Sequence, residues 1–234
     1  MKNKHLIVLF TFCWVINTSL LAQNSEMLHV VNFLGASIYS APSFDSQLIG
    51  LVEAGNKVYV NKSLERKVKK QVSADLGLEG NWLEIILDSS IGYIFSGDFT
   101  AKLITKDADL GSFEELNLFG KELEKKEFTE QTIIDGNSYP VQKIVRKYES
   151  AVVYETFFDG CHDTEYLLES FSLSEAYHQL INLTGRKFSH QFEIPRISSR
   201  EGNIWNFSDL DAIQNLKLQD LGGGKFKITF YSCT

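Results

Sequence analysis

Residues 81–95, NWLEIILDSSIGYIF, have the pattern of a β-hairpin. Successive residues of a strand point to opposite faces, and here Leu83, Ile85 and Leu87 share a face that is uniformly apolar. The tripeptide Asp-Ser-Ser at 88–90 consists of turn-forming residues. A second β run then follows it at 92–95. We therefore predict two antiparallel strands with the Leu83 face in a core.

Similar short β runs surround this hairpin between Gly35 and Phe99. They alternate with turn residues and cover 36–40, 47–51, 57–61, 82–87 and 92–95. This spacing predicts a small antiparallel barrel, which we place at residues 27–104.

Five ordered sequence blocks in this part carry a family resemblance. They are Ser37–Pro42, Leu48–Gly50, Gly55–Val58, Asn81–Ile85 and Gly92–Ser96. In this order they resemble the bacterial SH3 (SH3b) pattern, which implies an SH3-like, partly open barrel of several strands. Tyr39 stands where the family commonly has arginine, and Ala41 stands where it has glycine. No arginine contact is therefore carried over.

Aromatic residues are the candidate ligand-binding residues of this barrel. SH3-like barrels bind extended peptides through exposed rings in a shallow groove beside their loops. The candidates here are Tyr39, Phe44, Trp82 and Tyr93. Tyr39 and Phe44 border a Pro-containing turn, and we expect them to be exposed. Trp82 and Tyr93 have an equally strong alternative, because both rings could cover the barrel core.

The segment Lys62–Gly80 is an insertion between the middle blocks and is rich in basic residues. Clustered like charges most often face water, so we expect a solvated hairpin or loop. A ligand loop for an anionic group is the alternative.

A second domain is predicted at residues 117–234, after a linker at 105–116. Strand-like runs occur at 132–134, 141–148, 151–158, 164–169, 204–207, 212–218 and 225–231. One helix interrupts them, which predicts an α+β fold with an antiparallel sheet. The chain as a whole is thus expected to be mainly β. The helix start, Phe-Ser-Leu-Ser-Glu-Ala-Tyr at 171–177, resembles C-terminal regions of uncharacterised exported proteins with an SH3b module. This resemblance implies no activity.

The helix is predicted at Leu173–Thr184. Ser172 and Glu175 have the spacing of a capping box, and Gly185 is a natural stop. Apolar residues recur at helical spacing, namely Ala176, Tyr177, Leu180 and Ile181. We expect this face to pack against the second sheet, so that Leu180→Asp would unfold the second domain and leave the barrel intact. His178 is expected to be partly exposed.

Residues 1–22 have the features of a secretory signal peptide. Lys2 and Lys4 precede an apolar run at 6–16, and the small residue Ala22 marks the exit. The run is shorter than the roughly 20 residues of a membrane span, and no later segment approaches that length. We therefore expect an exported protein, periplasmic or secreted, without a membrane span after cleavage. Removing the two lysines would shift the formal charge from −7 to −9. Such a surface disfavours nucleic acid.

Two cysteines remain after cleavage, Cys161 and Cys233, and an oxidising compartment favours a disulfide between them. Two alternatives involve neighbouring residues. Cys161 with a histidine would suit a Cys/His peptidase, but the sequence around it lacks the expected motif. A metal site could combine His162, Asp163 and Glu165 with His178 or His190, but the usual ligand spacings are absent.

These patterns together predict a noncatalytic exported binding protein with no cofactor and no metal. Its expected partner is a peptide, a peptidoglycan component or an envelope protein. The alternatives are a cell-wall hydrolase of the Cys/His peptidase type, and a structural subunit or inhibitor in an envelope complex.

Overall fold

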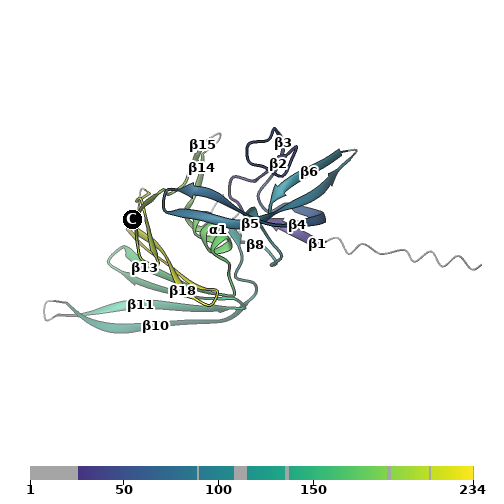
Figure 1. The fold of residues 1–234 in the computed structure, drawn as a ribbon. Helices are drawn as coiled ribbons and strands as arrows, with labels where there is room; N and C mark the ends of the chain where they lie inside the picture. Colours follow the sequence, from purple (N-terminus) through teal and green to yellow (C-terminus); the bar gives the residue numbers. More distant parts are fainter. Residues whose placement is uncertain are drawn as a thin grey trace, which may run out of the picture.

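The structure is a computed structural model that describes residues 26–88, 90–107, 115–134, 137–188, 191–210 and 212–233. The predicted signal peptide at 1–22 lies outside these residues. The described chain is mainly β, with antiparallel sheets and one α-helix, as the sequence predicts (Figure 1). No helix within the described ranges is long and apolar enough to cross a membrane.

The N-terminal part forms one antiparallel sheet of seven strands in the order β3-β2-β6-β5-β4-β1-β7. These strands are β1 (Glu26–Val30), β2 (Ala36–Tyr39), β3 (Leu48–Val52), β4 (Lys57–Ser73), β5 (Leu76–Leu87), β6 (Ser90–Phe95) and β7 (Phe99–Thr100), with the short 3-10 helix η1 (Ser96–Asp98) before β7. The sheet curls around its own apolar core, which contains Leu83, Ile85 and Ile94. β5 and β6 pair from Trp82↔Phe95 to Leu87↔Ser90, so the predicted hairpin and its core face are confirmed.

The C-terminal part forms an eight-stranded antiparallel sheet in the order β10-β11-β12-β13-β19-β18-β17-β16. Its strands are β10 (Glu122–Ile134), β11 (Asn137–Tyr148), β12 (Ala151–Phe158), β13 (Cys161–Glu169), β16 (Ile197–Glu201), β17 (Ile204–Phe207), β18 (Ile213–Gly222) and β19 (Lys225–Cys233). Two small hairpins complete the fold, β8 (Thr105–Asp107) with β9 (Glu115–Asn117) and β14 (Arg186–Phe188) with β15 (Gln191–Glu193). The predicted linker at 105–116 thus contains strand residues at both ends, and its middle, 108–114, lies outside the described residues.

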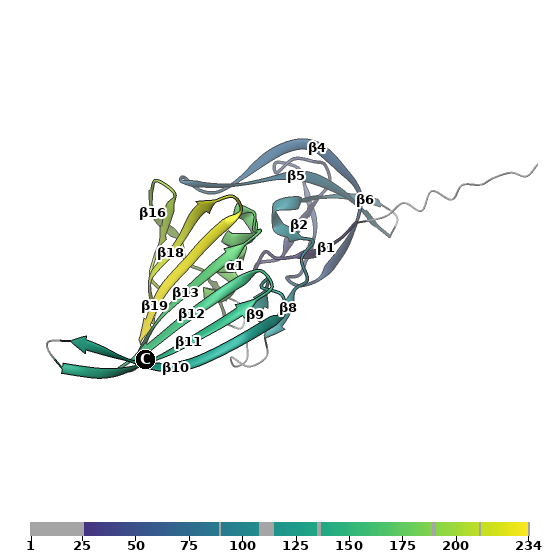
Figure 2. The same cartoon turned by 90° about the horizontal axis from the view of Figure 1, so that it is seen from below.

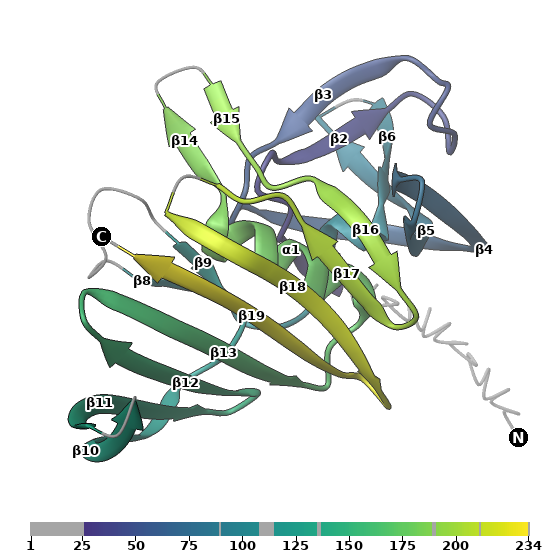
Figure 3. The same cartoon turned by 90° about the vertical axis from the view of Figure 1, so that its left-hand side faces the viewer.

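The helix α1 (Leu173–Thr184) has the predicted bounds and the predicted cap. The Ser172 hydroxyl accepts a hydrogen bond from the Glu175 N–H, and the Glu175 carboxylate accepts one from the Ser172 N–H. The helix ends at Gly185, whose N–H donates to the Ile181 carbonyl. Figures 1 and 3 show α1 between the eight-stranded sheet and the N-terminal strands.

The helix packs against the second sheet, as predicted, and it also contacts the N-terminal part of the chain, so Leu180 is not confined to a core of the second domain. On one side the Tyr177 ring lies 6.5 Å from the Phe207 ring of β17. On another side the Asn182 amide donates to the Val31 carbonyl at 2.9 Å. His178 is buried on this same N-terminal side, so the expectation that it is partly exposed is wrong. The helix is a central layer that packs against both sheets.

The insertion Lys62–Gly80 is also different from the expected solvated loop. It is the distal part of the long β4–β5 hairpin, which extends over α1 toward the second sheet (Figure 2). Leu76 and Leu78 are buried in the core beside the helix, and the Trp205 indole N–H of β17 donates to the Asp75 carbonyl at 3.0 Å. Alternation explains the difference, because the inward face of the hairpin carries apolar residues together with Lys70, whose ammonium binds Asp98, while other lysines face outward.

One apolar core therefore runs through both parts of the chain. It contains Trp82 and Phe95 of the N-terminal sheet, Leu180 of the helix, and Leu218 and Ile228 of the second sheet. The core is continuous across the predicted boundary at 105–116. The two sheets are consequently parts of one packed body.

The predicted disulfide is present between Cys161 and Cys233. These residues are direct partners on the neighbouring strands β13 and β19, with their Cα atoms 4.0 Å apart. The bond ties the end of the last strand to the start of β13.

Candidate functional site

Three of the four predicted ligand-binding residues form one aromatic cluster. The Phe44 ring lies 4.7 Å from the Trp82 ring and 6.0 Å from the Tyr39 ring, and Tyr39 and Trp82 are 5.4 Å apart. Ring pairs at these separations favour edge-to-face packing. The cluster continues into the core through Phe95.

Exposure separates the members of this cluster. Trp82 is only 2% exposed, so its ring covers the core and does not form a surface for a ligand. Tyr39 and Phe44, which we expected to be exposed, are half-buried, and Tyr93 is half-buried as well. Tyr93 lies beside Tyr39 because the two residues are direct partners between β6 and β2.

The strand next to these rings presents an apolar surface that the sequence analysis missed. Leu48 and Leu51 of β3 are each 58% exposed, and Ile49 is exposed between them. Leu48 is the direct partner of Tyr39, so their side chains share the face that also carries Tyr93. We call Leu48, Ile49, Leu51, Tyr39 and Tyr93 the β3 surface.

β3 is also the outermost strand of its sheet, with β2 as its neighbour on one side. It contains no charged residue. Edge strands are normally protected by charged side chains, since their free backbone groups can pair with another chain. The long edge strand β10 of the second sheet follows this rule, because its sequence ELEKKEFTEQTII is charged along most of its length. The β3 edge lacks this protection.

A buried acid lies between α1 and the N-terminal sheet. Asp98 of η1 accepts hydrogen bonds from the Lys70 ammonium at 2.8 and 3.0 Å and from the Asn32 amide at 3.0 Å. The imidazole Nε2 of His178 lies 3.4 Å from the same carboxylate. The side chains of Asp98 and His178 are no more than 4% exposed, so this pair is closed to a substrate in this structure.

The pKa of Asp98 is lowered in the folded protein. Burial acts to raise this pKa, but the His178 side chain and the Lys70 ammonium lower it more. Burial raises the pKa of the nearby Tyr177 phenol, and the negative charge of Asp98 raises it further. Asp98 therefore contributes stability in its ionised form, which is present above its unfolded pKa near 3.8 and is lost as the pH falls through the folded pKa.

We expect Asp98→Asn to destabilise the protein by about 2 kcal/mol at pH 7. This is less than the 3–5 kcal/mol typical of a fully buried pair, because the Lys70 side chain is 29% exposed. The difference from the wild type should shrink as the pH falls below about 3.8, because Asp98 of the unfolded chain takes up a proton there while the folded carboxylate, with its lowered pKa, stays ionised. Urea unfolding at pH 7 and pH 3 measures both values. Glu124→Gln is the matched control, since this carboxylate also has a lowered pKa but lies on the exposed surface, so its loss should change stability little. An equal gap at both pH values would contradict the assignment.

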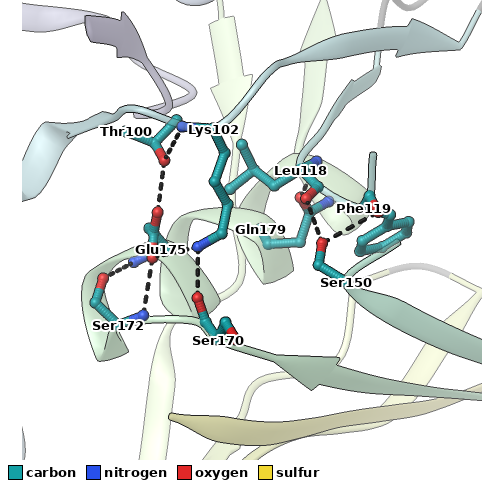
Figure 4. Close-up of polar contacts among 9 residues, drawn as sticks. All are labelled: Thr100, Lys102, Leu118, Phe119, Ser150, Ser170, Ser172, Glu175 and Gln179. Atoms are coloured by element: carbon teal, nitrogen blue, oxygen red, sulfur yellow. Dashed lines mark hydrogen bonds and ion pairs between the residues drawn. The ribbon is translucent and has the colours of Figure 1, made fainter. Parts of the chain in front are cut away.

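A second group of polar contacts connects the start of α1 to Thr100, the last residue of β7, and to Lys102 just after it (Figure 4). Glu175 accepts hydrogen bonds from the Thr100 hydroxyl at 2.5 Å and from the Lys102 ammonium at 2.8 Å, and Lys102 also donates to the Ser170 carbonyl. Burial acts to raise the pKa of Glu175, but the hydrogen bonds from Lys102, the Ser172 N–H and Thr100 lower it more. The cap of α1 is thus also a contact between the two sheets.

The middle of the helix makes a matching contact with the chain after β9. The Gln179 side chain accepts from the Leu118 N–H at 2.8 Å and donates to the Leu116 carbonyl at 3.4 Å. The Ser150 hydroxyl donates to the carbonyls of Leu118 and Phe119 (Figure 4). These bonds satisfy backbone groups that would otherwise be buried without partners. Together these hydrogen bonds hold the N-terminal sheet, which carries the β3 surface, in place relative to the second sheet.

The structure does not bring together the residues that the two alternatives from the sequence, a Cys/His peptidase site and a metal site, would require. The Cys161 sulfur is part of the disulfide and is not a free thiolate nucleophile. His162 stacks on Phe157 and alternates with Asp163 across the strand, so their side chains lie on opposite faces of the sheet. No group of three potential metal ligands occurs in the part of the chain that the structure describes, and His190 lies outside it.

Compared with known proteins, the chain matches no family model, no curated protein and no solved structure.

Proposed function

We propose that this protein is a noncatalytic exported binding protein that binds an extended peptide along the β3 surface. The observation that carries the proposal is the uncharged edge strand β3, with Leu48, Ile49 and Leu51 exposed in a row. An extended peptide can add to such an edge as a further strand. Its backbone would pair with the free edge groups of β3.

Side chains beside the edge supply the apolar contacts of this binding mode. Alternate residues of an added strand would lie on the face of Leu48 and Tyr39, and Tyr93 extends this face away from the edge. A half-exposed leucine that becomes buried contributes roughly 1 kcal/mol. The half-buried Tyr39 ring is already held by Phe44 and Trp82, so little conformational entropy is lost when a ligand packs on it.

Location supports an extracytoplasmic partner. The N-terminal pattern at 1–22 is typical of export, and the Cys161–Cys233 disulfide is typical of an oxidising compartment. We therefore infer that the peptide belongs to another envelope or secreted protein.

Selection from a displayed library of random peptides tests the proposal. We expect the full mature chain to enrich apolar peptides of strand-forming sequence, and Leu51→Lys to weaken the selected peptides at least tenfold. Leu103→Lys is the matched control, because this leucine is similarly exposed but lies after β7. Thermal unfolding should be the same for both variants.

Two results would contradict peptide binding at β3. One is a library from which no peptide is enriched over an unrelated control protein. The other is a set of peptides that bind Leu51→Lys as tightly as the wild type.

A further inference from the structure

A groove of about 650 Å³ lies on the face of the eight-stranded sheet opposite to α1. Residue pairing defines this face. Tyr154, Glu165, Thr229 and Lys217 form one row across β12, β13, β19 and β18. Thr156, Asp163 and Tyr231 form the next row, and all seven residues line the groove.

The opposite face of the same strands is core. Val153, Leu218 and Ile228 are buried there against the helix side. The groove residues alternate with these core residues along each strand, so their backbone positions are fixed by the packed core behind them. Figure 3 is drawn from the groove side, with α1 behind the sheet. The groove therefore has its own set of side chains on a well-packed sheet and is separate from the β3 surface.

Two tyrosines give the groove flat apolar surfaces. Tyr154 is 41% exposed, and Tyr231 is half-buried. They are two strands apart and one row apart, which places their Cα atoms roughly 12 Å from each other. A ligand that contacts both rings must therefore be longer than a single small ring.

The polar groups between the rings are of mixed type. Thr156 and Thr229 supply hydroxyls, and Asp163 and Glu165 supply carboxylates. Lys217 faces the groove, and Lys227 pairs with Glu165 at 3.4 Å, so the two acids are balanced by two ammonium groups. A strongly charged ligand gains little from such a surface. A ligand with many neutral hydroxyl groups finds donors and acceptors close together.

A β-bulge shapes one wall of the groove. Gln214 pairs with Tyr231 and Lys217 pairs with Thr229, so two residues of β18 stand opposite one residue of β19. One of the two is Asn215, which lines the groove and has a φ of 54°, in the left-handed region that is uncommon for residues other than glycine. Bulges re-aim side chains and are enriched beside functional sites, and strained backbone has the same association. The bulge adds an amide to the groove.

We propose that this groove binds a neutral oligosaccharide chain. The tyrosine rings would pack against the faces of two sugar units, and the hydroxyls, carboxylates and Asn215 amide would hydrogen-bond the sugar hydroxyl groups. A cell-wall glycan and an exopolysaccharide have this chemistry in common. The proposal does not depend on peptide binding at β3.

Titration of the full mature chain with two defined tetrasaccharides tests this proposal. One probe is the β-1,4-linked tetramer of N-acetylglucosamine, which represents cell-wall glycan, and the other is the β-1,4-linked tetramer of glucose, which represents a neutral exopolysaccharide. Calorimetry measures the affinity, and amide shifts in NMR spectra locate the contact. We expect at least one probe to bind and to shift residues of β12, β13 and β19. The probe with the higher affinity identifies the source.

Variants connect that binding to the groove. Tyr154→Ala and Tyr231→Ala should each lower the affinity at least tenfold. Tyr59→Ala is the matched control, since Tyr59 is an exposed tyrosine on β4 of the other sheet, and it should bind as the wild type does. Because Tyr154 is well exposed, its variant should keep the wild-type melting temperature.

Three outcomes would overturn the proposal. The first is that neither tetramer binds at millimolar concentration. The second is that Tyr154→Ala and Tyr59→Ala bind the tetramer equally well. The third is that a poly-glutamate or poly-lysine peptide shifts the groove residues while both sugars leave them unchanged. Peptide binding that is retained at β3 in any of these cases would leave the proposed function intact.

Discussion

Leu180→Asp is expected to unfold both sheets of the protein together. Leu180 is fully buried in the core that joins the N-terminal sheet, the helix and the eight-stranded sheet. Truncation of a buried leucine to alanine already costs about 2–5 kcal/mol, and a buried carboxylate adds a desolvation cost of similar size. This sum approaches the whole stability of a typical domain. Circular dichroism and limited proteolysis should show loss of protected fragments from both parts of the chain.

The matched control for this variant is Leu123→Asp, because Leu123 is exposed on the edge strand β10. It should keep the wild-type melting temperature within a few degrees. A protease-resistant fragment that spans residues 27–104 after Leu180→Asp would show that the N-terminal sheet is stable without the helix. That result would contradict the shared core and would support two independent domains.

Local patterns in the sequence predicted those elements whose signals are also local. The hairpin at 81–95 followed from alternation and turn residues, and α1 followed from its capping box and its glycine stop. The disulfide followed from the count of cysteines after cleavage. In each case the residues that determine the structure lie within the element or are its only possible partners.

Predictions failed where burial depended on the other half of the chain. The insertion Lys62–Gly80 was interpreted by its charges, although Val68, which lies between two lysines, and Val72 pack on the shared core. Lys70 points inward because Asp98 is there to accept its hydrogen bonds. His178 is buried for the same reason, since the N-terminal sheet covers that side of the helix. No single segment contains this information.

The candidate sites also depend partly on local sequence and partly on tertiary packing. The family resemblance selected Tyr39, Phe44 and Trp82, which do lie together, but only the tertiary packing makes Trp82 a core residue. The apolar strand of the β3 surface could have been recognised in the sequence, because Leu48–Val52 is a strand-like run without a charge. Whether that run lies at an edge depends on the strand order. The groove on the second sheet required the register of four strands and could not be predicted from spacing.

Loss of the Cys161–Cys233 disulfide is expected to destabilise the protein by about 2–4 kcal/mol. The bond closes a loop with a sequence separation of 72 residues, for which the chain-entropy model gives about 4 kcal/mol. Part of this value is lost if the reduced chain keeps residual structure. For a chain of this size each kcal/mol corresponds to about 2–4 °C, so the melting temperature should fall by roughly 10 °C. Thermal unfolding with and without a thiol reductant measures this difference.

The double variant Cys161→Ser and Cys233→Ser separates the effect of the bond from other effects of the reductant. Its melting temperature should equal that of the reduced wild type and should not respond to reductant. The cysteines pair at the end of β19, and Asp163 and Tyr231 form the next groove row two residues further along the strands. Fraying from this end would therefore reach the groove first, and the shared core around Leu180 would be affected later. Hydrogen exchange should show the largest increase at the 161–165 and 229–233 amides of the double variant, and a smaller increase, set by the lower global stability, at the α1 amides. An equal increase at all protected amides of both sheets would contradict fraying from this end of the strands.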